Sequence, residues 1–146
     1  MNSGAAIGAP GGPAADIVVV NNFDKNIRAF DRATGKLVWT HKVGGPSGGS
    51  ATIADSTVYI GSWDRNFYAL DAHTGALRLL LSLARCGLIA CGAAGSVKWT
   101  FAAAGEIESH PAYADGIVYM TAEESHALFA INATTGSQAA TGRRVT

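Results

Sequence analysis

The sequence predicts an all-β fold made of repeated four-stranded units, and three observations support this. Residues 21–37 align without a gap with residues 61–77, forty positions later, and seven of the seventeen aligned residues are identical. Short segments rich in β-branched and aromatic residues alternate with polar turns. Outside residues 76–95, no segment has the 3.6-residue periodicity of an amphipathic helix.

Each repeat predicts the same succession of strands. In the second copy a polar turn at residues 64–66 joins two apolar runs, because Asp and Asn bond the local backbone and tolerate left-handed conformations. The next turn ends in Gly75, which can adopt a positive φ. The expected strands are residues 51–54, 58–60 and 67–70, followed by one equivalent to residues 36–40 of the first copy. Four-stranded units of about forty residues are typical of β-propeller blades.

A third copy follows at a larger offset. Residues 117–120 repeat residues 57–60, and residues 130–136 repeat residues 69–75 with an offset of 61. About twenty residues are therefore inserted, and we place them at about 76–95, where a Leu-rich and then Gly/Ala-rich segment interrupts a strand. We expect a short helical or disordered insertion. Translated intervening sequence and a looped-out interaction hairpin or partner helix remain alternatives.

The sequence thus predicts a partial β-propeller of about three four-stranded blades. The predicted organisation is a flexible tail at 1–15, blades at 16–47, 48–104 and 105–138, and a tail at 139–146. Closed propellers contain roughly four to eight blades. Three blades expose apolar faces, so we expect them to be completed by remaining blades, self-association or a protein partner.

Residues 29–39, AFDRATGKLVW, resemble the tryptophan-docking motif A-x-D-x-x-T-G-x-x-x-W of the pyrroloquinoline-quinone-like (PQQ-like) β-propeller repeat family. Residues 58–64 and 68–71 are similar to a blade of that family. The resemblance implies that the Trp of one blade packs against the Thr-Gly turn of a neighbour, and so assigns Trp39 and Trp99 to blade contacts. The matching residues are Ala29, Asp31, Thr34, Gly35, Trp39, Ala69, Asp71, Thr74, Gly75, Trp99, Ala130, Asn132, Thr135 and Gly136.

The third copy departs from this motif. It has Asn132 in place of the Asp and Ala140 in place of the Trp, and in the second copy Trp99 follows Gly75 by 24 residues rather than four. The WD-type propeller fits less well. Of the Gly-His and Trp-Asp dipeptides that mark its blades, only one Trp-Asp pair, Trp63-Asp64, is present.

Composition and charge exclude some partners. Eleven basic and eleven acidic residues leave no net field to attract nucleic acid. The apolar segment 79–94 is shorter than the roughly 20 residues of a membrane span and contains Arg85. Residues 1–13 do not have the pattern of a secretory signal, so the compartment remains open: cytoplasmic from the sequence, periplasmic or secreted if the N-terminus is missing.

Few residues are candidates for chemistry. Cys86 and Cys91 lack the spacing of a zinc or redox motif. Alternation along an extended segment places Glu106, Glu108 and His110 on one face, where acid–base chemistry would need them convergent and desolvated; a solvated blade edge is the favoured interpretation. A similar run follows at 123–126, and residues 132–134 match a glycosylation sequon that chance also produces. Asp24, Asp31, Asp64 and Asp71 recur at the repeat period, which indicates turn residues.

The leading hypothesis is therefore an incomplete PQQ-like propeller that acts as a non-catalytic binding or scaffold module, or as a fragment of a longer propeller. No catalytic or metal-ligating residue is assigned, and no cofactor is expected. The alternative is a fragment of a quinoprotein alcohol or sugar dehydrogenase, for which the resemblance implies PQQ and calcium. A propeller appended to a larger activating enzyme and a homologue of the outer-membrane assembly propeller, which binds unfolded chains by strand addition, are further possibilities.

Overall fold

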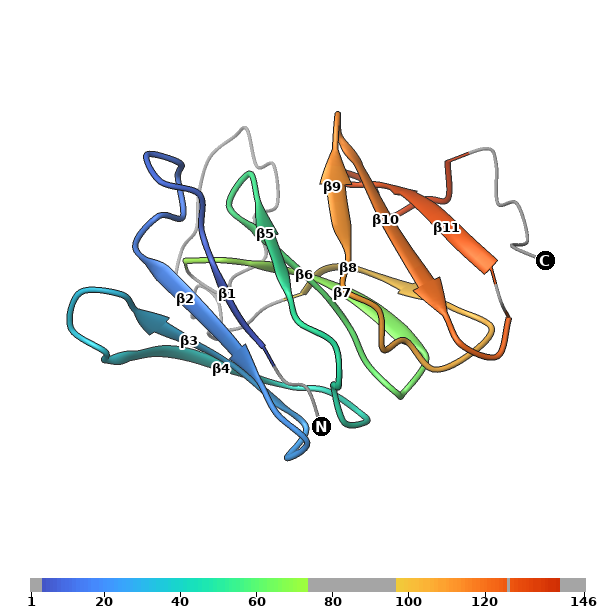
Figure 1. Ribbon diagram of the computed structural model, residues 1–146, viewed down its shortest axis with the longest axis horizontal. Helices are drawn as coiled ribbons and strands as arrows, with labels where there is room; N and C mark the ends of the chain where they lie inside the picture. Colours follow the sequence, from blue (N-terminus) through green and yellow to red (C-terminus); the bar gives the residue numbers. More distant parts are fainter. Residues whose placement is uncertain (1–3, 74–96, 126, 140–146) are drawn as a thin grey trace, which may run out of the picture.

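The computed structural model describes residues 4–73, 97–125 and 127–139, and every regular element in these ranges is a β-strand. The strands form three antiparallel sheets that lie side by side (Figure 1) and that we call blades one, two and three. Blade one contains β1 (Ala5–Ile7), β2 (Ile17–Asn21), β3 (Asn26–Asp31) and β4 (Leu37–Lys42). Blade two contains β5 (Thr52–Ala54), β6 (Thr57–Gly61), β7 (Asn66–Asp71) and β8 (Val97–Ala102). Blade three contains β9 (Ala112–Ala114), β10 (Ile117–Ala122) and β11 (Ala127–Asn132).

Each blade is a meander in which consecutive strands pair. In blades two and three, the turn between the first two strands is the tightest. Asp55 and Ser56 in blade two, and Asp115 and Gly116 in blade three, all have positive φ. Two consecutive residues with positive φ are the signature of a type I′ hairpin turn, whose twist matches that of the flanking strands.

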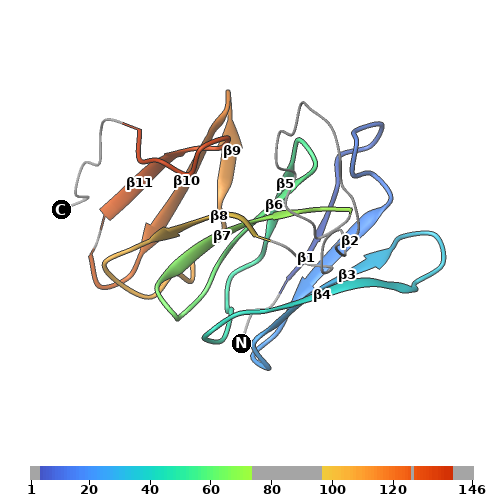
Figure 2. The same cartoon turned by 180° about the vertical axis from the view of Figure 1, so that it is seen from behind.

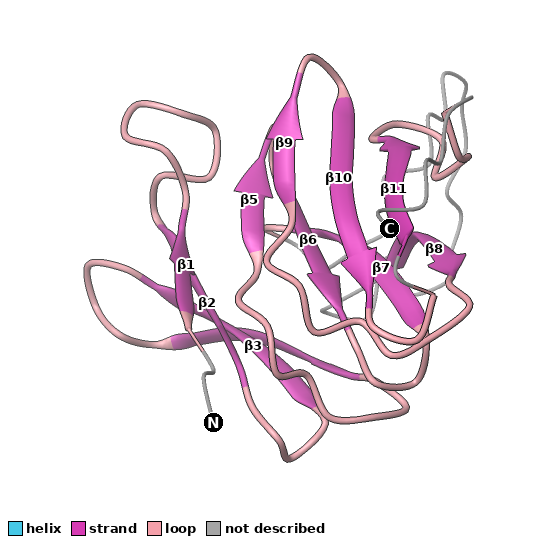
Figure 3. Cartoon of the chain, turned by 45° about the vertical axis from the view of Figure 1, so that its right-hand side comes forward, coloured by secondary structure: helices cyan, strands magenta, loops and turns pink. Residues whose placement is uncertain are grey.

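The first strands of the three blades lie next to one another. β5 contacts both β1 and β9, while β4 and β8 are the last strands of their sheets. The same arrangement is visible from behind (Figure 2) and in the view coloured by secondary structure (Figure 3). The blades therefore fan out from their first strands, as the blades of a propeller do, and the all-β, three-blade prediction is confirmed.

The structure differs from the sequence prediction in two details. Residues 1–15 do not form only a tail, because β1 pairs antiparallel with β2, with Ala5 opposite Val20 and Ile7 opposite Val18. The segment is rich in Gly and Ala and has no apolar alternation, so its pairing depends on backbone hydrogen bonds that leave little mark in the sequence. Blade three has three strands in its described part rather than four, and Gln138 forms only an isolated bridge with Ile131. The predicted insertion at 76–95 lies outside the described residues.

The hydrophobic core is divided between the two blade interfaces. Between blades one and two, Val19 and Ala29 pack with Val58 and Leu70, all fully buried. Between blades two and three, the core contains Tyr59, Phe67, Ala69, Ile107, Val118, Met120 and Ile131. Because blade two is covered on both faces, every residue of β6 is buried, which explains why Val58, Tyr59 and Ile60 follow one another without a polar residue between them. No helix in the described residues is long and apolar enough to cross a membrane.

Candidate functional site

The two described interfaces share one structural device, in which an indole from the last strand of a blade contacts the turn after the third strand of the next blade. We call this turn the docking turn. Trp39 in β4 is 2% exposed, and its Nε1 donates a hydrogen bond of 2.9 Å to the carbonyl oxygen of Ala72 in blade two. Trp39 lies opposite Ala29, whose small side chain leaves room for the ring. The indole therefore connects blade one to blade two.

Trp99 makes the equivalent contact from blade two to blade three. Its Nε1 donates to the carbonyl oxygen of Ala133 at 2.9 Å. The ring lies directly on Gly136, because a Cβ at that position would be 2.7 Å from Cδ2 of Trp99. Tyr59 and Phe67 flank the indole with centroids at 5.9 and 6.0 Å. Ala69 lies opposite Trp99 as Ala29 lies opposite Trp39. A side chain at Gly136 would therefore displace the indole.

The conformation of each docking turn is stabilised by a side-chain oxygen at the same position of the repeat, which accepts hydrogen bonds from the turn. In blade one, Oδ1 of Asp31 accepts hydrogen bonds from the backbone N and Oγ1 of Thr34, at 2.7 and 2.6 Å. These bonds lower the pKa of Asp31. In blade three, Oδ1 of Asn132 accepts from the backbone of Thr134 and Thr135, so the Asp-to-Asn exchange preserves the acceptor. The periodic Asp and Asn residues therefore shape turns, as their spacing predicts.

The remaining motif residues lie around the same turns. Asp71, which is buried, accepts from the backbone of His73 at 3.1 Å, and its Oδ2 lies 3.7 Å from Nζ of Lys98. Thr135 is hydrogen-bonded to Ser137 through their hydroxyls, and Ala130 lies in β11 opposite Tyr119. Thr74, Gly75, Cys86 and Cys91 lie outside the described residues.

The turn between the second and third strands holds the connection that arrives from the preceding blade. Oδ2 of Asp64 accepts from the hydroxyl of Tyr68 at 2.6 Å and from the backbone of Gly44 at 2.7 Å, while its Oδ1 accepts from the backbone of Asn66. Burial raises the pKa of Asp64, but these hydrogen bonds outweigh it, so the net pKa lies below the ordinary value. Burial raises the pKa of Tyr68 to about 12. Asp64 therefore ties blade one to blade two.

A buried polar network that the sequence analysis missed lies on the same connection. The Nδ2 of Asn21 donates to the carbonyl oxygens of Ser47 and Gly49 at 2.9 and 2.7 Å. The hydroxyl of Ser47 donates to the carbonyl oxygen of Gly61 at 2.6 Å. Its only signal in the sequence was an Asn at the end of a valine run and a Ser inside a glycine-rich loop. The network holds the connection against the ends of β2 and β6.

The structure brings the predicted carboxylates together but gives the imidazole a different role. Burial raises the pKa of Glu108, and a hydrogen bond with Glu123 and the charge of Glu106 add to this effect. The Nδ1 of His110 accepts a hydrogen bond of 3.0 Å from the backbone N of Ser50. His110 therefore holds the connection that enters blade two. Among residues 4–73, 97–125 and 127–139, no three His, Cys, Asp or Glu side chains form a group that could hold a metal ion.

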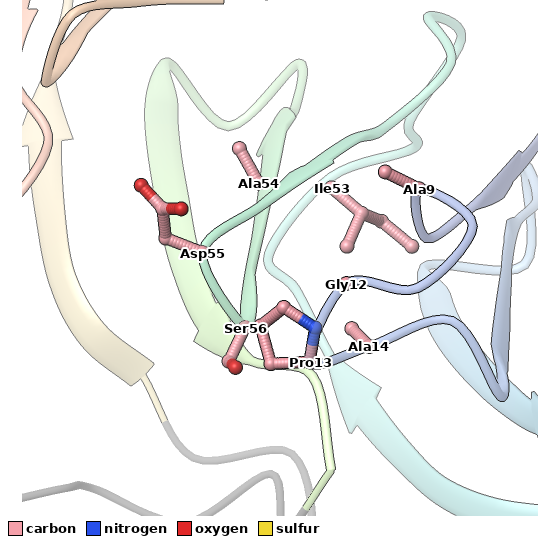
Figure 4. A pocket seen from close by; sticks show the side chains of 8 residues that line it. All are labelled: Ala9, Gly12, Pro13, Ala14, Ile53, Ala54, Asp55 and Ser56. Carbon is pink, nitrogen blue, oxygen red and sulfur yellow. The ribbon is translucent and has the colours of Figure 1, made fainter.

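A hollow of about 240 Å³ lies between the first turn of blade one and that of blade two (Figure 4). The side chain of Asp55 points away from Ile53 and Ala14, toward blade three, where its carboxylate accepts a hydrogen bond from the hydroxyl of Tyr113. The lining is otherwise small or apolar, and consists of Ala9, Gly12, Pro13, Ala14, Ile53, Ala54 and Ser56. The hollow thus offers little polar chemistry.

Comparison with known proteins agrees with this geometry. Residues 23–88 and 78–144 match the family described as outer membrane protein assembly factor BamB. The chain belongs to this BamB-like family of PQQ repeats. The tetrathionate hydrolase of Acidithiobacillus ferrooxidans is 33% identical over 131 residues, which cover 84% of this chain and 26% of that enzyme. The chain thus spans about a quarter of the length of this relative.

Solved structures share the fold at low sequence identity. BamB from Moraxella catarrhalis superposes with a TM-score of 0.71 at 18% identity, over 97% of this chain and 36% of that one. The computationally designed protein Ika4 superposes with a TM-score of 0.63, also at 18% identity, over 92% of this chain and 68% of its own. Both likenesses concern the arrangement of the blades.

Proposed function

We propose that this chain contributes three blades to a PQQ-like propeller that acts as a non-catalytic binding or scaffold module. The supporting observation is that the recurring polar side chains form hydrogen bonds within the turns and blade connections. Asp31 and Asn132 hold docking turns, and Asp64 holds a blade connection. Their hydrogen-bonding capacity is engaged by the fold itself, which leaves the blade faces and edges as the surfaces available for function.

Those faces are apolar where no blade covers them. On the outer side of blade one, Ile7 and Leu37 are each 55% exposed, and on the outer side of blade three Tyr119 and Leu128 are nearly 40% exposed. Exposed apolar patches of this kind mark protein interaction sites. The assembly role named for BamB supports a protein as the partner.

The binding role is tested by a dye that reports accessible apolar surface. We expect the purified chain to bind anilinonaphthalene sulfonate in its folded state, and Phe30→Asp, on the open side of blade one, to reduce the fluorescence. Thr134→Asp, on an exposed turn, is the matched control. Equal fluorescence in both variants would contradict open faces as the binding surface.

The proposal that the module is not catalytic is tested by a turnover assay. With PQQ and calcium added, we expect no dye-linked oxidation of alcohols or sugars. Oxidation that requires both additions would replace the scaffold proposal by the quinoprotein alternative, in which blades outside this chain would share the cofactor site.

A second candidate is a segment of a propeller hydrolase, and the 33% identity with tetrathionate hydrolase favours it. The candidate acid–base residue is Glu108, whose pKa is raised by burial and by the neighbouring Glu123 carboxylate. We would follow tetrathionate loss with the purified chain and with Glu108→Gln. Hydrolysis that depends on Glu108 would support this candidate, and its absence would support the scaffold role.

A further inference from the structure

We propose that two copies of this chain associate head to tail, with blade three of each copy on blade one of the other, and so close a ring of six blades. This inference rests on the proposed function and names a second copy as the protein that the open faces bind. The number of blades, the two open faces, a contact between turns and the distribution of charge support it.

The first observation is the number of blades. The described residues form three, and blades one and three lie at the two ends of the row (Figure 1). Because a closed propeller contains roughly four to eight blades, two copies give a ring inside this range and three copies exceed it. Contacts between two different surfaces form a closed ring when the rotation between the subunits closes. Two copies would then share two identical interfaces related by a two-fold axis.

The second observation concerns the open face of blade one, the side that no described blade covers. Directly paired residues of neighbouring strands lie on one face of a sheet. In blade two, the row that meets blade one consists of Ile53, Val58, Leu70 and Val97. The equivalent row on the open face of blade one consists of Ile7, Val18, Phe30 and Leu37. Its first and last members are each 55% exposed, so blade one presents the kind of apolar surface that blade two buries.

The open face of blade three corresponds to the opposite side of such an interface. In blade two, Tyr59 is paired with Ala69, and both residues lie in the core between blades two and three. Blade three has Tyr119 paired with Ala130 at the equivalent positions, and Tyr119 is 37% exposed. Leu128 is 39% exposed. The two open faces therefore repeat the two kinds of face that pack against each other inside the chain.

The third observation is that the turns between the second and third strands of neighbouring blades touch. The rings of Phe23 in blade one and Trp63 in blade two, which are forty positions apart, have centroids at 5.4 Å. Glu123 has the equivalent position in blade three, because its backbone N donates to the carbonyl of Glu106 as that of Trp63 does to Pro46. In the proposed ring, Glu123 of the second copy would therefore lie beside the turn that contains Phe23 and Lys25.

The fourth observation is the unequal distribution of charge between the end blades. Residues 105–139 contain five acidic side chains and no Lys or Arg, whereas residues 4–50 contain five basic and three acidic side chains. The exposed charges near the turns just described are Lys25 and Lys42 in blade one, and Glu123 and Glu124 in blade three. Complementary charge steers and orients association. Head-to-tail contact brings opposite charges together, whereas contact between two identical end blades would bring like charges together.

The association is tested on the wild-type chain by sedimentation equilibrium. We expect a reversible equilibrium between the monomer of 15.0 kDa and a dimer. Raising the salt concentration from about 50 mM to about 500 mM should weaken the dimer about tenfold, because salt screens exposed charges. A chain that stays monomeric up to about 1 mM at low salt would overturn the proposal, and so would an assembly larger than a dimer.

Charge reversal tests which blades meet. Glu123→Lys combined with Glu124→Lys reverses blade three, and Lys25→Glu combined with Lys42→Glu reverses blade one. Each double variant alone should associate about tenfold more weakly than the wild type, because both of its interfaces then join like charges. An equimolar mixture of the two should recover the wild-type affinity, since each interface of the mixed dimer again joins opposite charges.

Arg65→Glu is the matched control. Arg65 is the counterpart of Lys25 in blade two, is also exposed, and has φ of 69° where Lys25 has 64°. Its reversal should leave the affinity within about twofold of the wild type, because blade two does not lie at an open face.

Three results of the charge reversals would overturn the proposal. Weakening by only one double variant would indicate a dimer that forms through a single end blade. A mixture that does not recover the affinity would exclude head-to-tail contact, and an equal effect of Arg65→Glu would show that the end blades have no special part. None of these readouts depends on turnover or on dye binding. Dye binding without association would therefore leave the proposed function in place and overturn only this inference.

Discussion

Gly136→Ala should separate the effect of the indole contact from the effect of backbone strain. Alanine at φ 73° costs about 1–2 kcal/mol, because Cβ approaches the following carbonyl oxygen in the left-handed region. Its Cβ would also lie 2.7–2.9 Å from three atoms of the partly buried Trp99 ring, and overpacking of a close contact costs about 1–3 kcal/mol. The free energy of unfolding should therefore fall by about 2–5 kcal/mol.

Gly35→Ala is the internal reference for this experiment. Its turn has the same hydrogen bonds and a φ of 68°, but a Cβ there meets nothing within 4 Å. We expect this variant to lose only the strain energy of about 1–2 kcal/mol. The difference of about 1–3 kcal/mol corresponds to roughly 2–12 °C in melting temperature for a chain of this size.

The assay is thermal unfolding followed by circular dichroism, with urea unfolding as a second measure of the free energy. Near-ultraviolet dichroism or fluorescence of Trp99 should change in Gly136→Ala and not in Gly35→Ala. Equal losses in the two variants would refute the inference that the indole on Gly136 stabilises the interface between blades two and three.

Three further predictions concern other contacts. Trp39→Phe removes the donor to the carbonyl of Ala72 and should lower the free energy of unfolding by about 1–3 kcal/mol in urea titrations; an unchanged midpoint would mean that water replaces the bond. The folded pKa of Asp64 lies below its ordinary value of 3.8, so its stabilisation is present above that value and is lost as the pH falls through the folded pKa. Asp64→Asn should therefore lower the free energy of unfolding at neutral pH and reduce its dependence on pH in the acid range. An unchanged pH dependence in the acid range would show that Asp64 does not cause the loss of stability there. Ser56→Gly should raise the melting temperature slightly, because glycine relieves the φ of 59° in the first turn of blade two, and a decrease would show that chain entropy outweighs strain.

Much of the blade could be predicted because its signals are local. The turn at residues 64–66 and the apolar runs beside it depend on neighbours a few positions away. Because the unit repeats, Asn132 could be aligned with Asp31 and Asp71, although only the structure shows that it accepts equivalent hydrogen bonds. The strand pairing of blade two therefore agrees closely with the sequence prediction.

Contacts between distant segments could not be predicted in this way. β1 lies in the segment that the sequence predicts to be a tail, because its pairing with β2 uses backbone groups that any residue possesses. The bond from Asn21 to Gly49 spans 28 positions, and neither residue has a pattern that names its partner. His110 stood beside two glutamates in the sequence, yet its imidazole accepts from Ser50, sixty positions away.

The sequence by itself determined the repeat, the order of strands within a blade and the residues that shape the turns, because these follow from side-chain alternation and turn chemistry over a few residues. Only the tertiary structure decided which faces meet and which remain open. The turns at Gly35 and Gly136 have the same local conformation, and one holds an indole while the other does not. The physical reason is that docking depends on the position of a neighbouring blade, which packing between sheets sets and local sequence does not encode.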